Sequence, residues 1–319
     1  MAIPTQRPER IRVRVPAKIN PFLSVRGTRD DGYHELVTVF QSVALSDTLV
    51  MELDAAEGRL HHPTSGGRMQ IKLSHNGGAA VPDGDDNLIL RAARMLARRV
   101  GLSLDDTAAV RTRVMLEKRI PVGGGMAGGS ADAAAALVGL NDLWGAELSR
   151  VALLDIAEGL GADVPFCLIG NTAMATGRGS RLVGVLSRGV FEWVVCMAAE
   201  QLQTPTVYEA WDQHCTVNHI EADEVLTAIR SGDPERLGPA LHNDLQDAAE
   251  VLLPRLRADR RALVDAGALG AVLSGSGPTL LALAADTDEA QRIAARVAGR
   301  FAAVTVTNSP AGGPVVSHR

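Results

Sequence analysis

Hydrophobic and polar residues alternate near the start of the chain, where residues 10–16 read RIRVRVP. Alternation with a period of two is typical of a half-buried β-strand. The pattern continues as AKINPFLSVRG over residues 17–27 and reaches a polar turn, TRDDGYHE, at 28–35. Two further strand patterns, LVTVFQSVAL and DTLVMEL, follow at 36–45 and 47–53. We expect residues 55–70 to form a loop that contains glycine and histidine.

A helical pattern follows, NLILRAARMLARRVG at 87–101, and its final glycine is a typical stop signal. Residues 110–116, VRTRVML, read as a strand, and an alanine-rich helix is expected over 131–143. A second helical pattern runs through WGAELSRVALLDIAEGLG. The segment GADVPFCL at 161–168 then closes this half of the chain, with an extended Val-Pro pair after Asp163.

Strands and helices also alternate in the second half. Strand patterns occur at 172–179 and 191–198, and a helix-rich stretch runs from 204 to about 266. Residues 271–284 read as strand, tight turn and strand, followed by a helix at 288–301 and a last strand at 302–308. This order predicts an α+β protein of two domains, 1–170 and 171–308. We expect the tail, 309–319, to be disordered.

Composition narrows the functional class. The 319 residues are 46% hydrophobic but only 3% aromatic, so the core must consist of Val, Leu and Ala. A net charge of −5 argues against nucleic-acid binding, which needs a basic face. Three scattered cysteines give no metal spacing and fit a reducing compartment. No stretch reaches the roughly 18 apolar residues of a membrane span, so we expect a cytoplasmic protein without a membrane partner.

The most informative segment is PVGGGMAGGSADAAAAL at 121–137, with five glycines between Val122 and Ser130. A glycine loop that leads into a helix is a natural anion site, because the helix offers unpaired N–H groups and glycine allows close approach. Ser130 is a candidate N-cap. The alternative is a flexible turn before a core helix, but so many glycines carry a conformational cost that a ligand would explain.

The loop does not fit three well-known phosphate loops. A Walker loop needs a lysine after its last glycine, and none follows here. Although Gly123, Gly125 and Gly128 fit G-x-G-x-x-G, a helical pattern follows instead of the strand of a dinucleotide fold. The H-R-D and D-F-G elements of protein kinases are absent from the sequence.

Lysine is rare, because only Lys18, Lys72 and Lys118 occur among 32 basic residues. A lysine kept in an arginine-rich chain is a mild functional signal, since the two cations differ in shape and pKa. Lys18 lies in AKINPFL beside Asn20, although an edge-strand lysine in water is the alternative. Lys72 reads as a solvated strand residue, and Lys118 precedes the glycine loop.

Three other polar segments allow two interpretations each. Tyr33 and His34 could stack on and hydrogen-bond a planar base, or they could be structural. Asp163 could orient or deprotonate a hydroxyl, or it could cap a turn. The small residues of 275–279, GSGPT, could pack against the glycine loop across a cleft, or form a plain β-turn.

Taken together and in this order, the motifs resemble the three signatures of the GHMP small-molecule kinases. These are the lysine-bearing AKINPFL, the loop PVGGGMAGGSADAA and the late turn SGSGPT. The added segments RDDGYHEL, GADVPF and TPTVY resemble the branch that acts on a cytidine diphosphate alcohol in the non-mevalonate isoprenoid pathway. The resemblance covers about Val13 to Thr307. It implies a two-domain fold with the active site in the cleft between the domains.

The resemblance also implies an activity and site residues. It implies transfer of the ATP γ-phosphate to a substrate hydroxyl that Asp163 activates, with Lys18 pairing with that aspartate. The implied substrate contacts are Asn20, Tyr33, His34, Thr204, Pro205 and Tyr208. The implied ATP site is Asn87 with the loop residues Pro121, Val122, Gly123, Gly124, Gly125, Met126, Ala127, Gly128, Gly129, Ser130 and Ala131.

ATP and Mg²⁺ are the implied cofactors, and the magnesium ligands stay open. The expected partner is a small molecule, and we expect a monomer or a weak homodimer. Two alternatives stay open as well. One is another GHMP kinase, acting on homoserine, mevalonate or a sugar, although these substrates offer no base to stack. The other is a binding protein of the same fold, which the presence of both Lys18 and Asp163 disfavours.

Overall fold

A computed structural model describes residues 9–55, 67–78, 81–108 and 110–318. Most of the loop expected at 55–70 lies outside these residues. The first layer is a nine-stranded mixed sheet. Six of its strands follow one another in the order β13-β1-β2-β5-β3-β4. In addition, β6 pairs with β2, β7 pairs with β6, and β9 pairs with β1. Its strands are β1 (Arg10–Thr28), β2 (His34–Ala55), β3 (Arg68–His75), β4 (Ser103–Leu104), β5 (Val110–Glu117), β6 (Thr172–Gly177), β7 (Arg181–Gly184), β9 (His242–Asn243) and β13 (Val315–His318).

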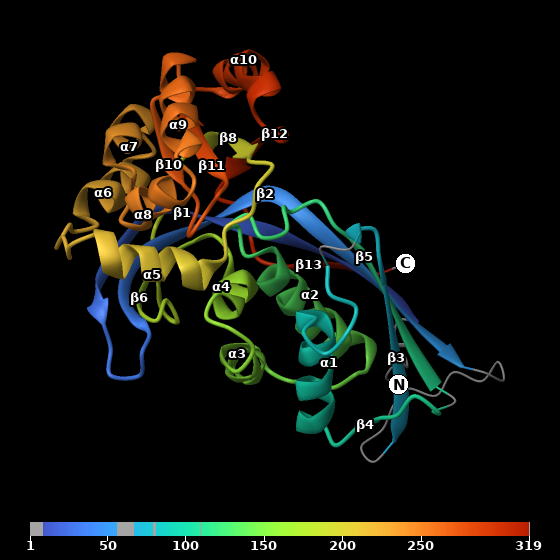
Figure 1. Cartoon of the computed structure of the whole chain (residues 1–319). Coiled ribbons are helices and arrows are strands. Elements are labelled where there is room, and N and C mark those ends of the chain that lie inside the picture. The colour runs from blue at the N-terminus through green and yellow to red at the C-terminus, as the bar shows by residue number, and fades with distance from the viewer. Residues whose placement is uncertain (1–8, 56–66, 79–80, 109, 319) are drawn as a thin grey trace.

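Strand β1 shows how the sequence pattern becomes burial. Ile11, Val13 and Val15 are fully buried, whereas Arg10 and Arg14 are exposed, as expected of alternating positions. From residue 16 to residue 25 every position is buried, because the strand passes between the two halves of the molecule. The long β1–β2 hairpin thus crosses the whole protein, as Figure 1 shows in blue.

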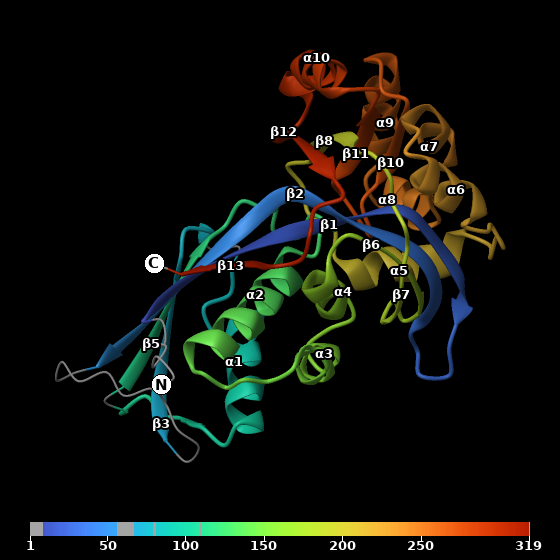
Figure 2. The same ribbon diagram turned by 180° about the vertical axis from the view of Figure 1, so that it is seen from behind.

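Four helices pack on one face of this sheet, seen below β1 and β2 in Figures 1 and 2. They are α1 (Leu88–Arg99), α2 (Gly128–Leu143), α3 (Arg150–Glu158) and α4 (Val164–Ile169). Helix α2 lies directly on the sheet, because its small residues allow a close approach. A Cβ at Gly139 would lie 2.2 Å from Met51 Cε, so this position has no room for a side chain.

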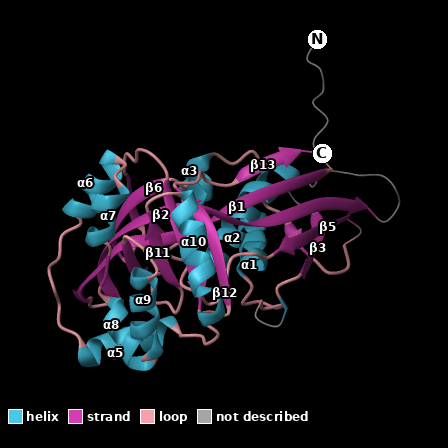
Figure 3. Ribbon diagram, turned by 90° about the horizontal axis from the view of Figure 1, so that it is seen from above, coloured by secondary structure: helices cyan, strands magenta, loops and turns pink. Residues whose placement is uncertain are grey.

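The second layer is a four-stranded antiparallel sheet in the order β10-β11-β8-β12, surrounded by helices (Figure 3). Its strands are β8 (Phe191–Met197), β10 (Gly270–Leu273), β11 (Leu280–Ala284) and β12 (Ala303–Ser309). Its helices are α5 (Thr204–His214), α6 (Asp223–Ser231), α7 (Pro234–Ala240), α8 (Leu245–Leu252), α9 (Arg255–Asp265), α10 (Thr287–Val297) and the short 3₁₀ helix η2 (Ala298–Arg300). The α+β class is confirmed. No helix among the described residues is both long and apolar enough to cross a membrane.

The expectation about the C-terminal tail is wrong. The tail expected to be disordered instead forms β13, in which His318 pairs with Ile11 and Val315 pairs with Arg14 at the edge of the first sheet. The boundary expected at residue 170 stays a prediction, and segments on its C-terminal side contribute strands to the first sheet. Strand β6 pairs with β2, and β7 and β9 join the same sheet, so segments after 170 complete the first layer. Edge pairing depends on which strand edge is free, and local sequence does not encode that.

Candidate functional site

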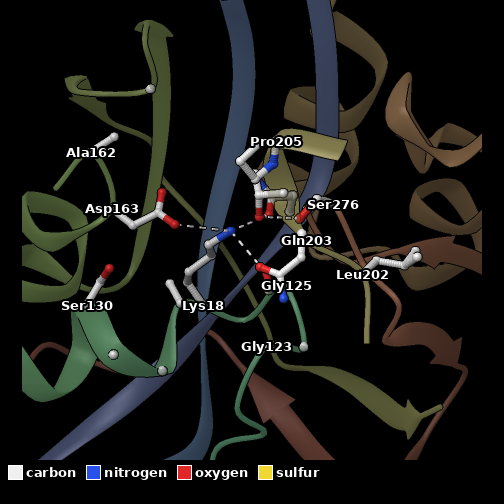
Figure 4. A pocket seen from close by; sticks show the side chains of 18 of the residues that line it. Lys18, Gly123, Gly125, Ser130, Ala162, Asp163, Leu202, Gln203, Pro205 and Ser276 are labelled. Carbon is white, nitrogen blue, oxygen red and sulfur yellow. Dashed lines mark hydrogen bonds and ion pairs between the residues drawn. The ribbon is translucent and has the colours of Figure 1, made fainter. Parts of the chain in front are cut away.

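A large cleft of about 880 Å³ lies where the two layers meet. Its size is at the upper end of the usual range for small-molecule sites. One wall comes from β1, β2 and the loop before α2, and the other comes from the start of α5 and the turn at 275–276. Figure 4 shows Lys18 and Asp163 pointing toward each other, with Gly125, Pro205 and Ser276 close by. The cleft therefore joins residues that are far apart in the sequence.

The glycine loop connects β5 to α2, and its shape depends on glycine. Gly125 has a φ of 72°, and a Cβ there would lie 1.9 Å from the Ser274 carbonyl oxygen, which no side chain permits. Ser274 Oγ donates a hydrogen bond of 3.2 Å to the Gly125 carbonyl. Both interpretations of residues 275–279 hold, because the Gly277 N–H closes a turn with the Ser274 carbonyl at 2.8 Å, and this turn packs directly against Gly125.

Ser130 is not the N-cap that the sequence suggested. Helix α2 begins at Gly128, three residues before the expected start at residue 131. Its N-cap is Ala127 in the left-handed region, with a φ of 54° and no side-chain hydrogen bond. Ser130 lies inside the first turn and lines the cleft instead. The first amides of α2 are thus left without a side-chain cap, as suits an anion site.

Asn87 also lines the cleft, and it does cap a helix. Its Oδ1 accepts the Ile89 N–H at 2.9 Å, and its Nδ2 donates to the Pro82 carbonyl at 2.7 Å. The side chain therefore fixes the start of α1 at the edge of the cleft.

Lys18 is held on β1 by contacts from three directions. Its Nζ donates to Asn20 Oδ1 at 2.8 Å and to the Gly125 carbonyl at 3.3 Å, and it lies 5.3 Å from the centre of the Phe40 ring. Asn20 is itself fixed, because its Nδ2 donates to Thr38 Oγ1 at 2.8 Å. Asn20 therefore orients the ammonium group, while its amide keeps a second N–H and a second lone pair at the cleft.

Asp163 completes this arrangement at 3.6 Å from Lys18 Nζ. The residues after Asp163 form helix α4, not the extended pair that we expected, because Pro165 in the first turn needs no N–H partner. Asp163 stands at the N-cap position but caps no amide, and its side chain keeps 32% of its surface exposed toward the cleft. The carboxylate is therefore accessible to a ligand.

An aromatic group lines the part of the cleft beside the β1–β2 turn. The His34 ring stacks on Tyr208 with 4.5 Å between centres and meets Trp211 edge-on at 5.7 Å. His34 Nε2 lies 2.8 Å from Asp212 Oδ1. Burial, with a smaller effect of the Asp163 charge, raises the pKa of Tyr208 well above its usual value. Tyr33 is 53% exposed, and the Arg178 guanidinium lies over its ring.

Beneath the glycine loop lies a buried triad of Lys118, Asp47 and Asp132. Lys118 Nζ contacts Asp47 Oδ2 at 2.5 Å and Asp132 Oδ2 at 2.7 Å. Asp132 Oδ1 has no hydrogen-bond partner among the residues that the structure describes. Burial, reinforced by the charge of Asp47 and opposed by Lys118, raises the pKa of Asp132 to about 8. The structure thus gives Lys118 and Asp132 partners that the sequence could not assign.

Most of the predicted site residues line this cleft. Those that do are Lys18, Asn20, Tyr33, His34, Asn87, Pro121, Val122, Gly123, Gly124, Gly125, Ala127, Gly128, Gly129, Ser130, Asp163, Thr204, Pro205 and Tyr208. Met126 and Ala131 do not, because their side chains are fully buried in the core. Sequence reasoning missed Arg178 and the contact between Thr204 Oγ1 and Ser276 Oγ at 2.8 Å. The glycines on both sides of Arg178 were the only signal for a turn there.

Family models match both halves of the chain. The GHMP kinase N-terminal domain matches residues 87–171, and the GHMP kinase C-terminal domain matches residues 225–303. Together the two matches include the glycine loop of one wall of the cleft and the turn at 275–276 of the other.

Relatives with curated names match nearly the whole chain. A 4-diphosphocytidyl-2-C-methyl-D-erythritol kinase from Saccharopolyspora erythraea is 46% identical over 98% of this chain and 94% of its own length. The kinase of the same name from Mycobacterium tuberculosis is 41% identical over 97% of this chain and 92% of its own length.

Solved structures agree with the architecture. A crystal structure of 4-(cytidine 5'-diphospho)-2C-methyl-D-erythritol kinase is 33% identical, with a TM-score of 0.75 over 94% of this chain and 100% of that one. A homoserine kinase from Cytophaga hutchinsonii has a TM-score of 0.70 at 18% identity, covering 99% of each chain, so it shows the shared fold alone.

Proposed function

We infer that this chain, which belongs to the GHMP kinase family, transfers the γ-phosphate of ATP to the 2-hydroxyl of 4-diphosphocytidyl-2-C-methyl-D-erythritol. The products are the 2-phosphate and ADP, and the reaction belongs to the non-mevalonate isoprenoid pathway. The observation that carries the inference is a single cleft that joins a lysine–aspartate pair, a glycine loop at a helix start and an aromatic group. The same family was expected from the sequence motifs.

In this proposal, Lys18 and Asp163 carry out the phosphoryl transfer. Phosphoryl transfer needs alignment and charge neutralisation more than covalent chemistry. Asp163 is accessible and orients the acceptor hydroxyl, accepting its proton as transfer proceeds. Lys18 stays beside it because Asn20 and the Gly125 carbonyl hold the ammonium group in place. The uncapped amides of α2 and the glycine loop bind the phosphates of ATP.

The aromatic group recognises the cytosine in this proposal. Tyr33 and Tyr208 supply ring faces for stacking, and His34 supplies a ring nitrogen for the base edge. Thr204 and Pro205 form the neighbouring wall at the start of α5. Homoserine and mevalonate carry no base, so such a group would have no role for them.

Mg²⁺ is also part of the proposal. Bound with ATP, it supplies charge neutralisation at the phosphates. The Asp163 carboxylate and the Ser130 hydroxyl both line the cleft and are oxygen donors of the kind that Mg²⁺ prefers. These two side chains are among the oxygen donors of the cleft that could contact the metal or its waters.

The decisive experiment measures ADP release with ATP, Mg²⁺ and the cytidine diphosphate substrate, beside homoserine and mevalonate. We expect turnover with the cytidine compound alone. Turnover with a control substrate instead would keep the kinase class and reject the substrate. Absence of turnover with all three would reject the kinase activity in favour of a binding protein.

A further inference from the structure

Arg178 has a position in the cleft that the proposed function leaves unexplained. It lies in the turn between β6 and β7, flanked by Gly177 and Gly179, which have φ values of 71° and 87°. In the β2–β6 pairing, Gly177 lies opposite Leu36. The register therefore brings Arg178 beside the start of β2, where its guanidinium carbon lies 3.4 Å from the centre of the Tyr33 ring.

Arg178 differs from the two lysines that line the cleft, because each lysine faces a carboxylate. Lys18 faces Asp163, and Lys118 is held by two carboxylates. Among the described residues, no carboxylate lies within ion-pair distance of Arg178. Its charge is the smallest of the effects that lower the pKa of Asp31, behind the Tyr33 backbone N–H and Arg29. Of the lysines and arginines described along the cleft, Arg178 thus keeps an uncompensated charge.

The substrate inferred above carries two phosphates whose charge needs a partner. These phosphates join the cytidine to the alcohol. They must therefore lie between the aromatic group at Tyr33, His34 and Tyr208 and the transfer site at Lys18 and Asp163. Arg178 lines the same cleft and contacts Tyr33, so its guanidinium lies at the aromatic end of this path.

We propose that Arg178 binds the diphosphate group of the cytidine substrate. A guanidinium suits this ligand because its planar fork can donate two parallel hydrogen bonds to phosphate oxygens. The Tyr33 ring orders the side chain by a cation–π contact without neutralising its charge. The arginine lies over the Tyr33 ring, and Tyr33 still keeps 53% of its surface exposed. This proposal rests on the proposed function and extends it to the diphosphate, which the aromatic group does not bind.

A series of ligands that differ only in phosphate tests the proposal. Affinities of cytidine, CMP and CDP would be measured by calorimetry, with EDTA present to remove metal ions. The proteins are the wild type, Arg178→Met, Arg178→Lys and the control Arg181→Met. Arg181 lies on β7 three residues away, is exposed, and does not line the cleft.

Loss of one charge-assisted contact predicts that Arg178→Met weakens CDP binding about tenfold to a hundredfold and leaves cytidine binding unchanged. Arg178→Lys should recover part of the loss, because it keeps the charge but not the fork. Arg181→Met should match the wild type with all three ligands. Equal CDP affinity in Arg178→Met and wild type would overturn the proposal. So would a loss that is as large for cytidine as for CDP, because that result would assign Arg178 to the base.

Kinetics separate this proposal from the function on which it rests. If wild-type enzyme phosphorylates the cytidine substrate, Arg178→Met should raise KM for it about tenfold or more and leave kcat and KM for ATP nearly unchanged. A fall in kcat with KM unchanged would overturn the diphosphate assignment and leave the kinase function standing. Failure of the wild type to turn over the substrate would reject the function itself. The CDP series would still report whether Arg178 binds phosphate.

Discussion

Two lysines lie on either side of the glycine loop, equally buried but set in very different surroundings. Each side chain is 6% exposed, and each faces at least one aspartate. Lys118 contacts two carboxylates at 2.5 and 2.7 Å, and Asp47 is fully buried and also accepts the N–H groups of Arg119 and Ile120. Lys18 lies 3.6 Å from one carboxylate, Asp163, which stays partly exposed.

In the proposed function, this difference separates a structural ion cluster from the pair that takes part in phosphoryl transfer. Asp47 accepts hydrogen bonds from Lys118, Arg119 and Ile120, and these bonds connect β2 to the segment that leads into the glycine loop. Asp163 keeps oxygen lone pairs free toward the cleft, where a hydroxyl can use them. The two lysines are equally buried, so the accessibility of the partner carboxylate is what supports the catalytic proposal for Lys18 and Asp163.

The largest effect is expected from Asp163→Asn. If Asp163 orients and deprotonates the hydroxyl, kcat should fall about 10²- to 10⁴-fold, while KM for ATP changes little. Steady-state ADP release measures both. The control is Asp155→Asn, an exposed aspartate on α3. A loss confined to ATP affinity would remove Asp163 from the transfer step.

Lys118→Met tests the structural role of the cluster of Lys118, Asp47 and Asp132. Removing the cation leaves Asp47 and Asp132 facing each other in a buried site, which should lower the free energy of unfolding by about 3–5 kcal/mol. Urea unfolding followed by circular dichroism gives this value. The control Lys72→Met replaces an exposed strand lysine and should have little effect. A Lys118→Met variant as stable as the wild type would contradict the structural role.

Lys18→Arg keeps the positive charge and tests whether the site needs a compact ammonium group. The planar fork cannot reproduce the contacts of the ammonium with Asn20, the Gly125 carbonyl and Asp163. Losing one charge-assisted hydrogen bond of about 1.5–3 kcal/mol predicts a fall in kcat of about tenfold to a hundredfold. Turnover by this variant at the wild-type rate would refute the requirement for a compact cation.

The smallest effect concerns Asp132 and depends on pH. Because the pKa of Asp132 is raised to about 8 in the folded protein, the folded state holds its proton more tightly than the unfolded state. This contribution to stability is complete below about pH 4, the unfolded pKa, and is lost as pH rises toward 8. Asp132→Asn removes the titration. Its free energy of unfolding relative to wild type should therefore rise between pH 5 and pH 8.

One pKa unit corresponds to about 1.4 kcal/mol, so the gain across this range should be at least of that order. Urea unfolding at four pH values would measure it, with Asp155→Asn as the exposed control. A constant difference between Asp132→Asn and the wild type across the range would show that Asp132 titrates normally.

The sequence itself determined the features that are local. The alternation at residues 10–16, the helix that Asn87 begins and the glycine loop before α2 each depend on neighbours within a few positions. Backbone geometry and side-chain spacing fix them wherever the segment lies. The motif combination also indicated the family, and it singled out Lys18 and Asp163 before their distance was known.

Only the tertiary structure decided what depends on distant partners. Lys118 meets Asp47 from 71 residues away, Arg178 reaches Tyr33 through the β2–β6 register, and the tail pairs with β1 at the other end of the chain. It also showed that Ser130 caps nothing, because α2 starts earlier than its alanines suggest. Such contacts are set by packing and strand register across the whole chain, and no local window of sequence contains both partners.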